Sequence, residues 1–168
     1  MAKDYFIADT HFGHEAIIRY ENRPFKDIRE QEDVLIKNWN DTVSPEDTVY
    51  ILGDFGMSDS KEDTIRLCKL LNGRKILIIG NHDTNEPEWY RQCGFTEVSP
   101  WPIIYKGFWI LSHEPLYINQ NMPYANIYGH VHANPIYKDC SRQSVCVCVE
   151  RTEYKPIAFD AIEKKVLG

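Results

Sequence analysis

The histidines are the most informative residues of this chain, because they gather in short clusters. All six lie in four segments, which read Asp9-Thr10-His11-Phe12-Gly13-His14, Gly80-Asn81-His82-Asp83, Ser112-His113-Glu114 and Gly129-His130-Val131-His132. Each of these segments follows a predicted strand. In α/β sheets, residues just past the carboxyl ends of the strands line a common crevice. We therefore expect these clusters to meet in one site, together with Asp54, which follows another predicted strand.

The spacing of these residues is typical of metal ligands. Side chains alternate in an extended chain, so Asp9 and His11 point the same way, and so do His130 and His132. The candidate ligands are Asp9, His11, Asp54, Asn81, His113, His130 and His132. One four-coordinate ion cannot use so many ligands, whereas two ions that share a carboxylate can. Carboxylate and imidazole ligands suit Mn, Fe, Zn or Ni rather than Ca, and Mn is favoured.

Two divalent ions would give this site a local charge opposite to that of the whole chain. The chain carries 19 Lys and Arg against 25 Asp and Glu, a formal net charge of −6. Two ions against two carboxylates leave the site at about +2, which attracts a phosphate group. Ions about 3.5–4 Å apart can bind phosphoryl oxygens and lower the pKa of a bridging water. The predicted chemistry is therefore hydrolysis of a phosphate ester.

The elements that must position these residues alternate between strands and helices in the first half of the chain. Apolar runs predict strands at residues 5–8, 48–52 and 75–79, with an amphipathic helix at 28–39 and another that is capped at Ser58 and ends at Asn72-Gly73. This order is typical of a parallel sheet with crossover helices. After a short helix at 88–93, further strands are predicted at 103–105, 108–111, 127–128 and 145–149, before a terminal helix at 157–164. They indicate a second, mixed or antiparallel sheet packed on the first.

The motifs, taken in this order, resemble the signature of the calcineurin-like metallophosphoesterase superfamily. They are Asp9-x-His11, Gly53-Asp54, Gly80-Asn81-His82-Asp83, His113 and Gly129-His130-x-His132. Ordered motifs spread from residue 9 to residue 132 make the resemblance specific. The opening at residues 9–14 and the segment Glu153-Tyr154-Lys155-Pro156-Ile157 also resemble small stand-alone bacterial and phage phosphoesterases. The resemblance implies an α/β fold, a four-layer α/β/β/α sandwich of two mixed sheets.

The resemblance also implies a role for each motif residue. One metal ion would be held by Asp9, His11 and His132, the other by Asn81, His113 and His130, and Asp54 would bridge the two ions. His82 would not be a ligand; it would contact the phosphate and protonate the leaving oxygen, with Asp83 as its orienting partner. An imidazole is the usual proton donor to a poor alkoxide leaving group, because its pKa lies near neutrality.

His14 and Arg23 lie outside this ligand set and are candidate substrate-binding residues. His14 could instead orient a metal ligand or cap the following helix. Arg23 could pair with a phosphate, or it could belong to a solvated helix face. Cys146 and Cys148 alternate within a valine-rich strand. We expect both to pack as small apolar side chains rather than to form a soft-metal clip.

Length and composition narrow the remaining classes of protein. A chain of 168 residues that is 43% hydrophobic predicts a single domain over residues 1–168. No apolar run approaches the roughly 18 residues that cross a bilayer, and no signal peptide is evident, so we expect no membrane partner. Five cysteines without a CxxC pair favour a reducing compartment, the cytoplasm. The acidic balance disfavours long nucleic acid as a partner.

These observations favour a dinuclear-metal phosphodiesterase in which a hydroxide that bridges the metals attacks phosphorus directly. We expect a small phosphate ester as substrate, with a nucleotide among the candidates, because little of the chain is left to cover the site. A phosphomonoesterase or a nucleotide pyrophosphate hydrolase is the alternative, since the same core accommodates either. A non-catalytic binding scaffold is an alternative of another class, and the complete set of ligands together with His82 argues against it.

Overall fold

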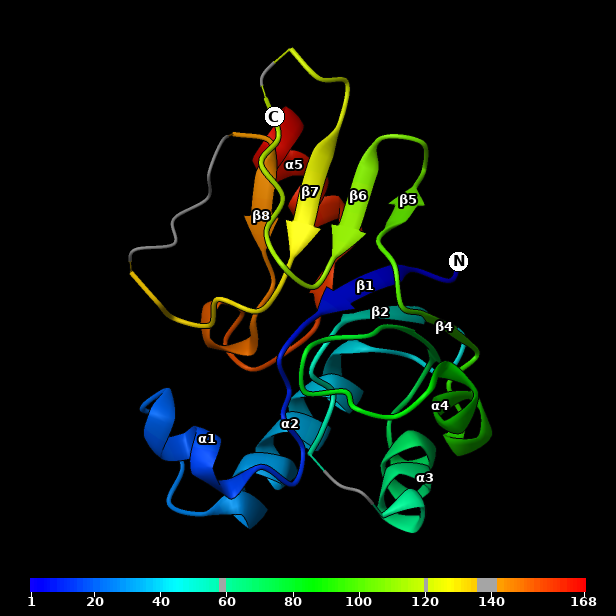
Figure 1. Ribbon diagram of the computed structural model, residues 1–168, viewed down its shortest axis with the longest axis vertical. Coiled ribbons are helices and arrows are strands. Elements are labelled where there is room, and N and C mark those ends of the chain that lie inside the picture. The colour runs from blue at the N-terminus through cyan, green and yellow to red at the C-terminus, as the bar shows by residue number, and fades with distance from the viewer. Residues whose placement is uncertain (58–59, 120, 136–141) are drawn as a thin grey trace.

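The computed structural model describes residues 1–57, 60–119, 121–135 and 142–168 (Figure 1). Its first sheet has the strand order β4-β3-β2-β1-β9. These strands are β1 (Asp4–Ile7), β2 (Thr48–Leu52), β3 (Arg74–Ile78), β4 (Glu97–Ser99) and β9 (Ile157–Ala158). β1 to β4 are parallel, whereas β9 is antiparallel to β1. Because β1, β2 and β3 are parallel neighbours, the chain leaves all three at the same edge of the sheet.

The second sheet directs two further strand ends toward that edge. It consists of β5 (Ile103–Tyr105), β6 (Trp109–Ser112), β7 (Ala125–Tyr128) and β8 (Ser144–Cys146), in that order. β6, β7 and β8 are parallel, and β5 is antiparallel to β6. The arrowheads of β6 and β7 point toward the first sheet in Figure 1. His113 follows β6 and Gly129-His130 follows β7, so these residues are carried toward the ends of β1 and β2.

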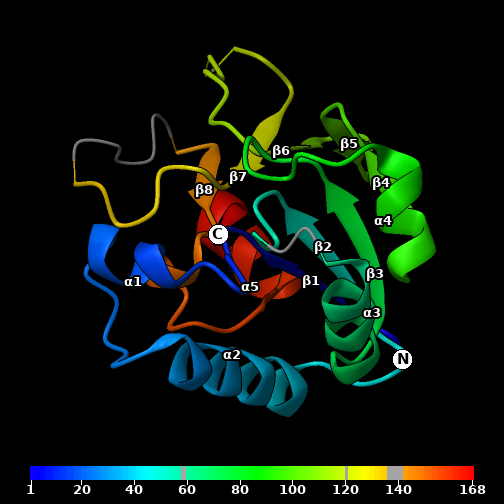
Figure 2. The same cartoon turned by 60° about the horizontal axis from the view of Figure 1, so that its bottom comes forward.

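Three helices cover the face of the first sheet that is turned away from β6–β8 (Figures 1 and 2). They are α2 (Ile28–Thr42), α3 (Lys61–Leu70) and α4 (Pro87–Cys93). Asp27 caps α2 by accepting a hydrogen bond from the Glu30 N–H, and Ser60 caps α3 through the Asp63 N–H. The cap of α3 is therefore Ser60, while the predicted cap Ser58 lies outside the described residues.

The two faces of β1 pack into different cores. Ile7 faces the helices and belongs to a cluster that includes Leu35 and Trp39 of α2. Phe6, which points to the opposite face because side chains alternate along a strand, packs between the two sheets with Ile127. The C-terminal helix α5 (Phe159–Leu167) lies behind β7 and β8 in Figure 1 and inserts Phe159 into the same inter-sheet cluster.

The end of β1 also pairs with the segment that follows β8. The Ala8 N–H donates to the Val147 carbonyl at 3.0 Å, and the Val149 N–H donates to the Ala8 carbonyl at 3.1 Å. These bonds form an isolated parallel bridge between Ala8 and Cys148. The short 3₁₀ turn Val149–Arg151 comes directly after this bridge, so it lies beside the first residues that follow β1.

The predicted α/β fold with two mixed sheets is confirmed. The parallel strand-helix order of the first half and the mixed second sheet both occur as expected. Four short elements were not predicted, because so few residues show no clear periodicity: α1 (Glu15–Tyr20), β4, the 3₁₀ turn Val149–Arg151 and β9. β9 occupies Ile157 and Ala158, where the terminal helix was expected to start, so that helix begins at Phe159 instead. None of the helices in the described ranges is both long and apolar enough to cross a bilayer.

Candidate metal centre

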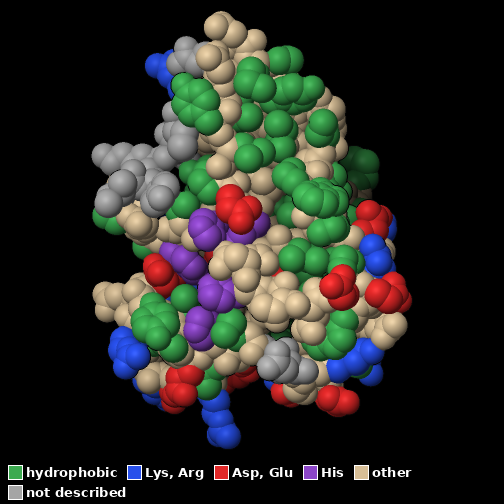
Figure 3. Space-filling view, viewed as in Figure 1, with side chains coloured by type: hydrophobic (Ala, Val, Ile, Leu, Met, Phe, Trp, Pro, Cys, Tyr) green, Lys and Arg blue, Asp and Glu red, His purple; other side chains and the backbone are tan. Residues whose placement is uncertain are grey.

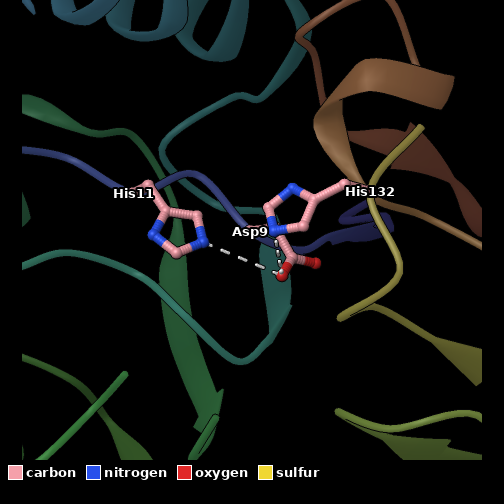
Figure 4. A group of neighbouring side chains, drawn as sticks. All are labelled: Asp9, His11 and His132. Carbon is pink, nitrogen blue, oxygen red and sulfur yellow. Dashed lines mark ion pairs between the residues drawn. The ribbon is translucent and has the colours of Figure 1, made fainter. Parts of the chain in front are cut away.

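Asp9, His11 and His132 form the first ligand group, in which the three side chains point toward one another (Figure 4). Asp9 and His11 follow β1, whereas His132 lies in the loop after β7. The Asp9 Oδ1 atom lies 4.0 Å from His11 Nε2 and 3.7 Å from His132 Nε2. Asp9 and His11 are completely buried. One carboxylate oxygen and two imidazole nitrogens thus surround a common point from which water is largely excluded.

Asp54, which follows β2, lies between this group and a second one. Its Oδ2 atom is 3.5 Å from His11 Nε2 and 3.6 Å from His113 Nε2. Its other oxygen, Oδ1, accepts a hydrogen bond from the His82 backbone N–H at 2.8 Å, which fixes the orientation of the carboxylate. The geometry therefore fits the shared position that Asp54 was expected to occupy.

Asn81, His113 and His130 form the second ligand group. The Asn81 Oδ1 atom lies 2.8 Å from His113 Nε2 and 2.9 Å from His130 Nδ1, and those two nitrogens are 3.2 Å apart. His113 Nδ1 lies 2.9 Å from the Leu52 carbonyl. Because a carbonyl can only accept, Nδ1 carries the proton and Nε2 presents a lone pair to its neighbours. An amide oxygen and two ring nitrogens converge here as ligands of a divalent cation would.

The backbone is left-handed at several of these positions. Non-glycine residues with positive φ include Asp9 at 59°, His11 at 50°, Asp54 at 54°, His130 at 70° and His132 at 48°. For a residue with a side chain, this backbone conformation costs conformational energy. Such residues cluster at functional sites, where the surrounding structure holds the backbone in this conformation. The coincidence of strained backbone with the predicted ligands links the local conformation to the site.

Two buried polar atoms of the first ligand group lack a hydrogen-bond partner among the described residues, namely Asp9 Oδ1 and His11 Nε2. Burial raises the pKa of Asp9 to about 6 and lowers the pKa of His11 well below its ordinary value. Buried polar groups are normally satisfied, and a cation between these two atoms would satisfy both. The residues of the first group therefore fit a divalent metal ion.

Comparison with known proteins agrees with this arrangement. The family model of calcineurin-like phosphoesterases matches residues 5–142. This chain belongs to that family. The matched range contains both ligand groups and Asp54. The family implies divalent metal ions, and Asp9, His11 and His132 form a group that could hold one.

Two curated relatives are similar to this phosphoesterase, one over nearly the whole chain and one over about half of it. The uncharacterized protein MJ1445 of Methanocaldococcus jannaschii is 40% identical over 173 residues, which cover 99% of this chain and 92% of the relative. The Gene 66 protein of Mycobacterium phage L5 is 36% identical over 89 residues, 52% of this chain and 42% of the phage protein. The similarity to a phage protein that the motifs predicted is found over about half of this chain. The similarity over nearly the whole chain is to an archaeal protein of similar length.

Two solved structures resemble this phosphoesterase. The protein AQ665 of Aquifex aeolicus, described as of unknown function, has a TM-score of 0.78 and 33% identity, and the match covers 98% of this chain and 99% of that one. The nuclease MPE of Pseudomonas putida has a TM-score of 0.50 and 20% identity, covering 77% and 61% of the two chains. At 20% identity, the similarity to the nuclease shows a shared fold alone.

His82 and Asp83, the two residues predicted to act in catalysis, occupy different environments. His82 is exposed, and its ring centroid lies 5.3 Å from that of His11. Asp83 is buried, and its carboxylate accepts hydrogen bonds from the backbone N–H groups of Asp54, Phe55 and Gly80. The side-chain hydrogen bonds found among the described residues do not join Asp83 to the His82 ring. Asp83 therefore ties the loops after β2 and β3 together rather than orienting His82.

His14 and Arg23 were candidates for substrate binding, and the structure gives both of them protein partners. His14 Nδ1 lies 3.1 Å from His11 Nδ1, so this half-buried ring contacts the nitrogen of His11 that is turned away from Asp54. The Arg23 side chain is fully buried, and its guanidinium donates to the carbonyls of Asp9 and Thr10. A substrate role for Arg23 is therefore wrong, because its donors face protein groups inside the fold.

Sequence reasoning missed Glu150 and expected Cys148 only to pack as a small apolar side chain, but both residues contact the first ligand group. Glu150 Oε1 lies 3.0 Å from His132 Nδ1, and Cys148 Sγ lies 3.2 Å from Asp9 Oδ2. Burial alone would raise the pKa of Glu150, but the hydrogen bond with His132 and the charge of Arg23 outweigh it and lower that pKa. Both residues follow β8, so the rule that strand ends line the site could have identified them.

A groove opens beside the metal centre. It has a volume of about 740 Å³, and its lining includes Tyr20, Glu21, Glu114, His130 and His132. Figure 3 shows histidine side chains gathered on one face of the molecule, at the level where the two sheets meet. The exposed side of the site is therefore formed by both ligand groups, and a ligand in the groove would contact His130 and His132.

Proposed function

We propose that this phosphoesterase hydrolyses phosphodiesters with the help of two divalent metal ions, with Mn²⁺ favoured over Fe, Zn and Ni. The observation that carries the proposal is the position of Asp54. Its Oδ2 atom lies 3.5 Å from a nitrogen of the first ligand group and 3.6 Å from a nitrogen of the second. A carboxylate placed between two sets of ligands is what a two-ion site needs, and Mn²⁺ accepts this mixture of oxygen and nitrogen ligands.

The side chains of the site would have two different roles, metal binding and proton donation. When bound, the ions would supply positive charge for the phosphate oxygens and a nucleophilic water at neutral pH. Asp9, His11 and His132 would hold one ion, and Asn81, His113 and His130 the other. His82 is exposed beside them, and its own backbone N–H is anchored on Asp54. We assign His82 as the donor of a proton to the leaving oxygen, since an alkoxide leaves slowly until it is protonated.

The groove supports a small phosphate ester as the substrate, and a nucleotide is one candidate. Its volume of about 740 Å³ falls in the range of pockets that take small molecules. The described lining residues include the carboxylates of Glu21 and Glu114 but no Lys or Arg. Such a lining suits an uncharged or cationic organic group, whereas a long polyanion needs a row of cations. Long nucleic acid is therefore not the substrate we propose.

The cysteines support a cytoplasmic location as part of the proposal. Cys68 and Cys93 are buried free thiols, and the buried Cys148 thiol donates to Asp9 Oδ2. Burial raises the pKa of Cys68 to about 12, which keeps this thiol protonated and unreactive. Thiols in this state are typical of proteins in a reducing compartment.

The proposal is tested by comparing two chromogenic substrates. The protein is stripped of metal, Mn²⁺ is restored, and the rates on bis(p-nitrophenyl) phosphate and p-nitrophenyl phosphate are measured. We expect metal-dependent cleavage with the diester turned over faster. A faster monoester would show that the protein is a phosphomonoesterase instead. No turnover of either ester with Mn, Fe, Zn or Ni would contradict the enzyme assignment and favour a binding scaffold.

A further inference from the structure

A buried ion pair joins Arg23 and Glu150, two residues that contact the segments carrying the ligands of the first group. The Arg23 side chain is 0% exposed and the Glu150 side chain 4%. Arg23 Nε and Nη2 lie 2.8 Å and 2.7 Å from Glu150 Oε1. These residues are 127 positions apart in the chain. Hiding two opposite charges is costly and often adds no net stability compared with an apolar pair of the same size. A contribution to stability therefore does not explain why Arg23 and Glu150 form a buried ion pair.

On one side the pair holds the backbone that carries Asp9 and His11. Arg23 Nη2 donates to the Asp9 carbonyl at 2.7 Å, and Nη1 donates to the Thr10 carbonyl at 3.1 Å. Nη1 also donates to Gln31 Oε1, and Gln31 in turn donates to the His11 carbonyl. The backbone is left-handed at Asp9 and His11, a conformation that needs support from its surroundings. Arg23 provides that support directly.

On the other side the pair holds the ring of His132. The same Glu150 oxygen that faces Arg23 lies 3.0 Å from His132 Nδ1. A carboxylate accepts hydrogen bonds, so Nδ1 carries the proton and Nε2, which faces Asp9 Oδ1, is left with its lone pair. Arg151, the residue after Glu150, donates to the His132 carbonyl at 2.7 Å and so fixes the backbone of the loop that carries His132.

We propose that Arg23 and Glu150 are positioning residues that raise the affinity of the Asp9–His11–His132 group for a divalent cation. Arg23 fixes the two ligands that follow β1, Glu150 fixes the third, and the ion pair locks these segments to each other. Outer partners of this kind set the ring orientation and tautomer of a ligating histidine, and losing one costs about 10- to 100-fold in metal affinity. The inference rests on the proposed two-ion site, but its readout is metal binding rather than turnover.

The test is a calorimetric titration of metal-stripped protein with Mn²⁺, for the wild type and Glu150→Gln. The amide keeps the size of the side chain and can still accept a hydrogen bond, but it removes the carboxylate charge. We expect one of the two binding steps to weaken about 10- to 100-fold, with the other unchanged. The matched control is Glu153→Gln on the same segment, since the side chain of Glu153 is 83% exposed and pairs with Lys155. The control should bind Mn²⁺ like the wild type.

A second variant covers the case in which Glu150→Gln does not fold, which thermal melting would reveal. Glu150→Asp keeps the charge beside Arg23 but draws the carboxylate back from His132, so it should weaken the same binding step. The visible spectrum of bound Co²⁺ should change in both variants if the ring of His132 has turned. Wild-type affinities in every folded Glu150 variant would overturn the inference and leave the proposed function intact. A wild type that binds no divalent ion would overturn the proposed two-ion site, and this inference with it.

Discussion

The two ligand groups share Asp54 but are built differently. In the first group, Asp9 and His11 are 0% exposed, and Arg23, Glu150 and Cys148 contact the ligands from behind. In the second group, only His113 is buried, while Asn81 and His130 are exposed and bonded mainly to each other and to His113. The first group is thus oriented by the protein before a cation binds. The second opens on solvent, where a substrate arrives.

This difference assigns separate tasks to the two groups. A buried group with fixed tautomers is suited to retain an ion through many turnovers, because its ligands lose little freedom on binding. An exposed group can exchange contacts with water or with an ester oxygen. The groove is lined by His130 of the second group and His132 of the first, so a ligand in it would contact both groups. Single substitutions in each group can test whether the two groups differ in this way.

The largest effect is expected where the two groups meet. Asp54→Ala removes the carboxylate between His11 and His113, so both groups lose an oxygen ligand. Metal-dependent turnover should be undetectable, and the metal content after dialysis should fall below that of the wild type. The control is Asp41→Ala, because the side chain of Asp41 is 62% exposed and pairs only with Lys37 among the described residues. Substantial activity in Asp54→Ala would show that the two groups work independently.

His82 tests whether chemistry can be separated from metal binding. His82→Ala should lower kcat by about 10²- to 10⁴-fold, the usual contribution of a general acid, while both ions remain bound. Steady-state kinetics on the diester and metal analysis of the same sample measure the two effects together. Thr84→Ala, a change on the same loop at an exposed residue, serves as the control. Equal metal loss in His82→Ala and Asp54→Ala would mean that His82 is a ligand.

A substitution at Gly53 tests how closely the backbone after β2 packs against His113 of the second group. A Cβ atom at Gly53, where φ is +86°, would lie 2.2 Å from His113 Nδ1 and 2.8 Å from the Gly80 Cα. Gly53→Ala should therefore cost about 1–3 kcal/mol from overpacking in addition to the left-handed strain. Gly107→Ala is the control, since φ is +69° there but a Cβ would meet nothing within 4 Å. Urea unfolding that gave equal losses for the two variants would refute the close contact with His113.

The smallest effect compares one histidine from each group in metal-free protein. His132→Ala leaves the buried Glu150 carboxylate without its imidazole partner, so the free energy of unfolding should fall by about 1–3 kcal/mol. His130 is exposed, and His130→Ala should stay within about 0.5 kcal/mol of the wild type. Urea unfolding in the presence of a chelator measures both. Equal losses would mean that the first group is no more preorganised than the second.

The parts of this site that the sequence predicts are those set by local patterns. Asp9, Asp54 and His113 each follow an apolar strand, and parallel strands release their ends at one edge, so convergence could be foreseen. The roles of Arg23 and Asp83 could not, because their partners lie far along the chain or on the backbone. The polar residues around Arg23 in the sequence are typical of a surface segment. Only in the folded chain do Gln31 of α2, Glu150 and the backbone after β1 surround its guanidinium.

The central claim is that two ions held around Asp54 drive ester hydrolysis. It is tested most directly by titrating metal-stripped wild type with Mn²⁺ while measuring both heat and the rate of diester cleavage at each step. The account predicts two binding events, with the buried group filled first and turnover rising as the second ion binds. Full turnover in the metal-free protein, or after a single binding event, would contradict it.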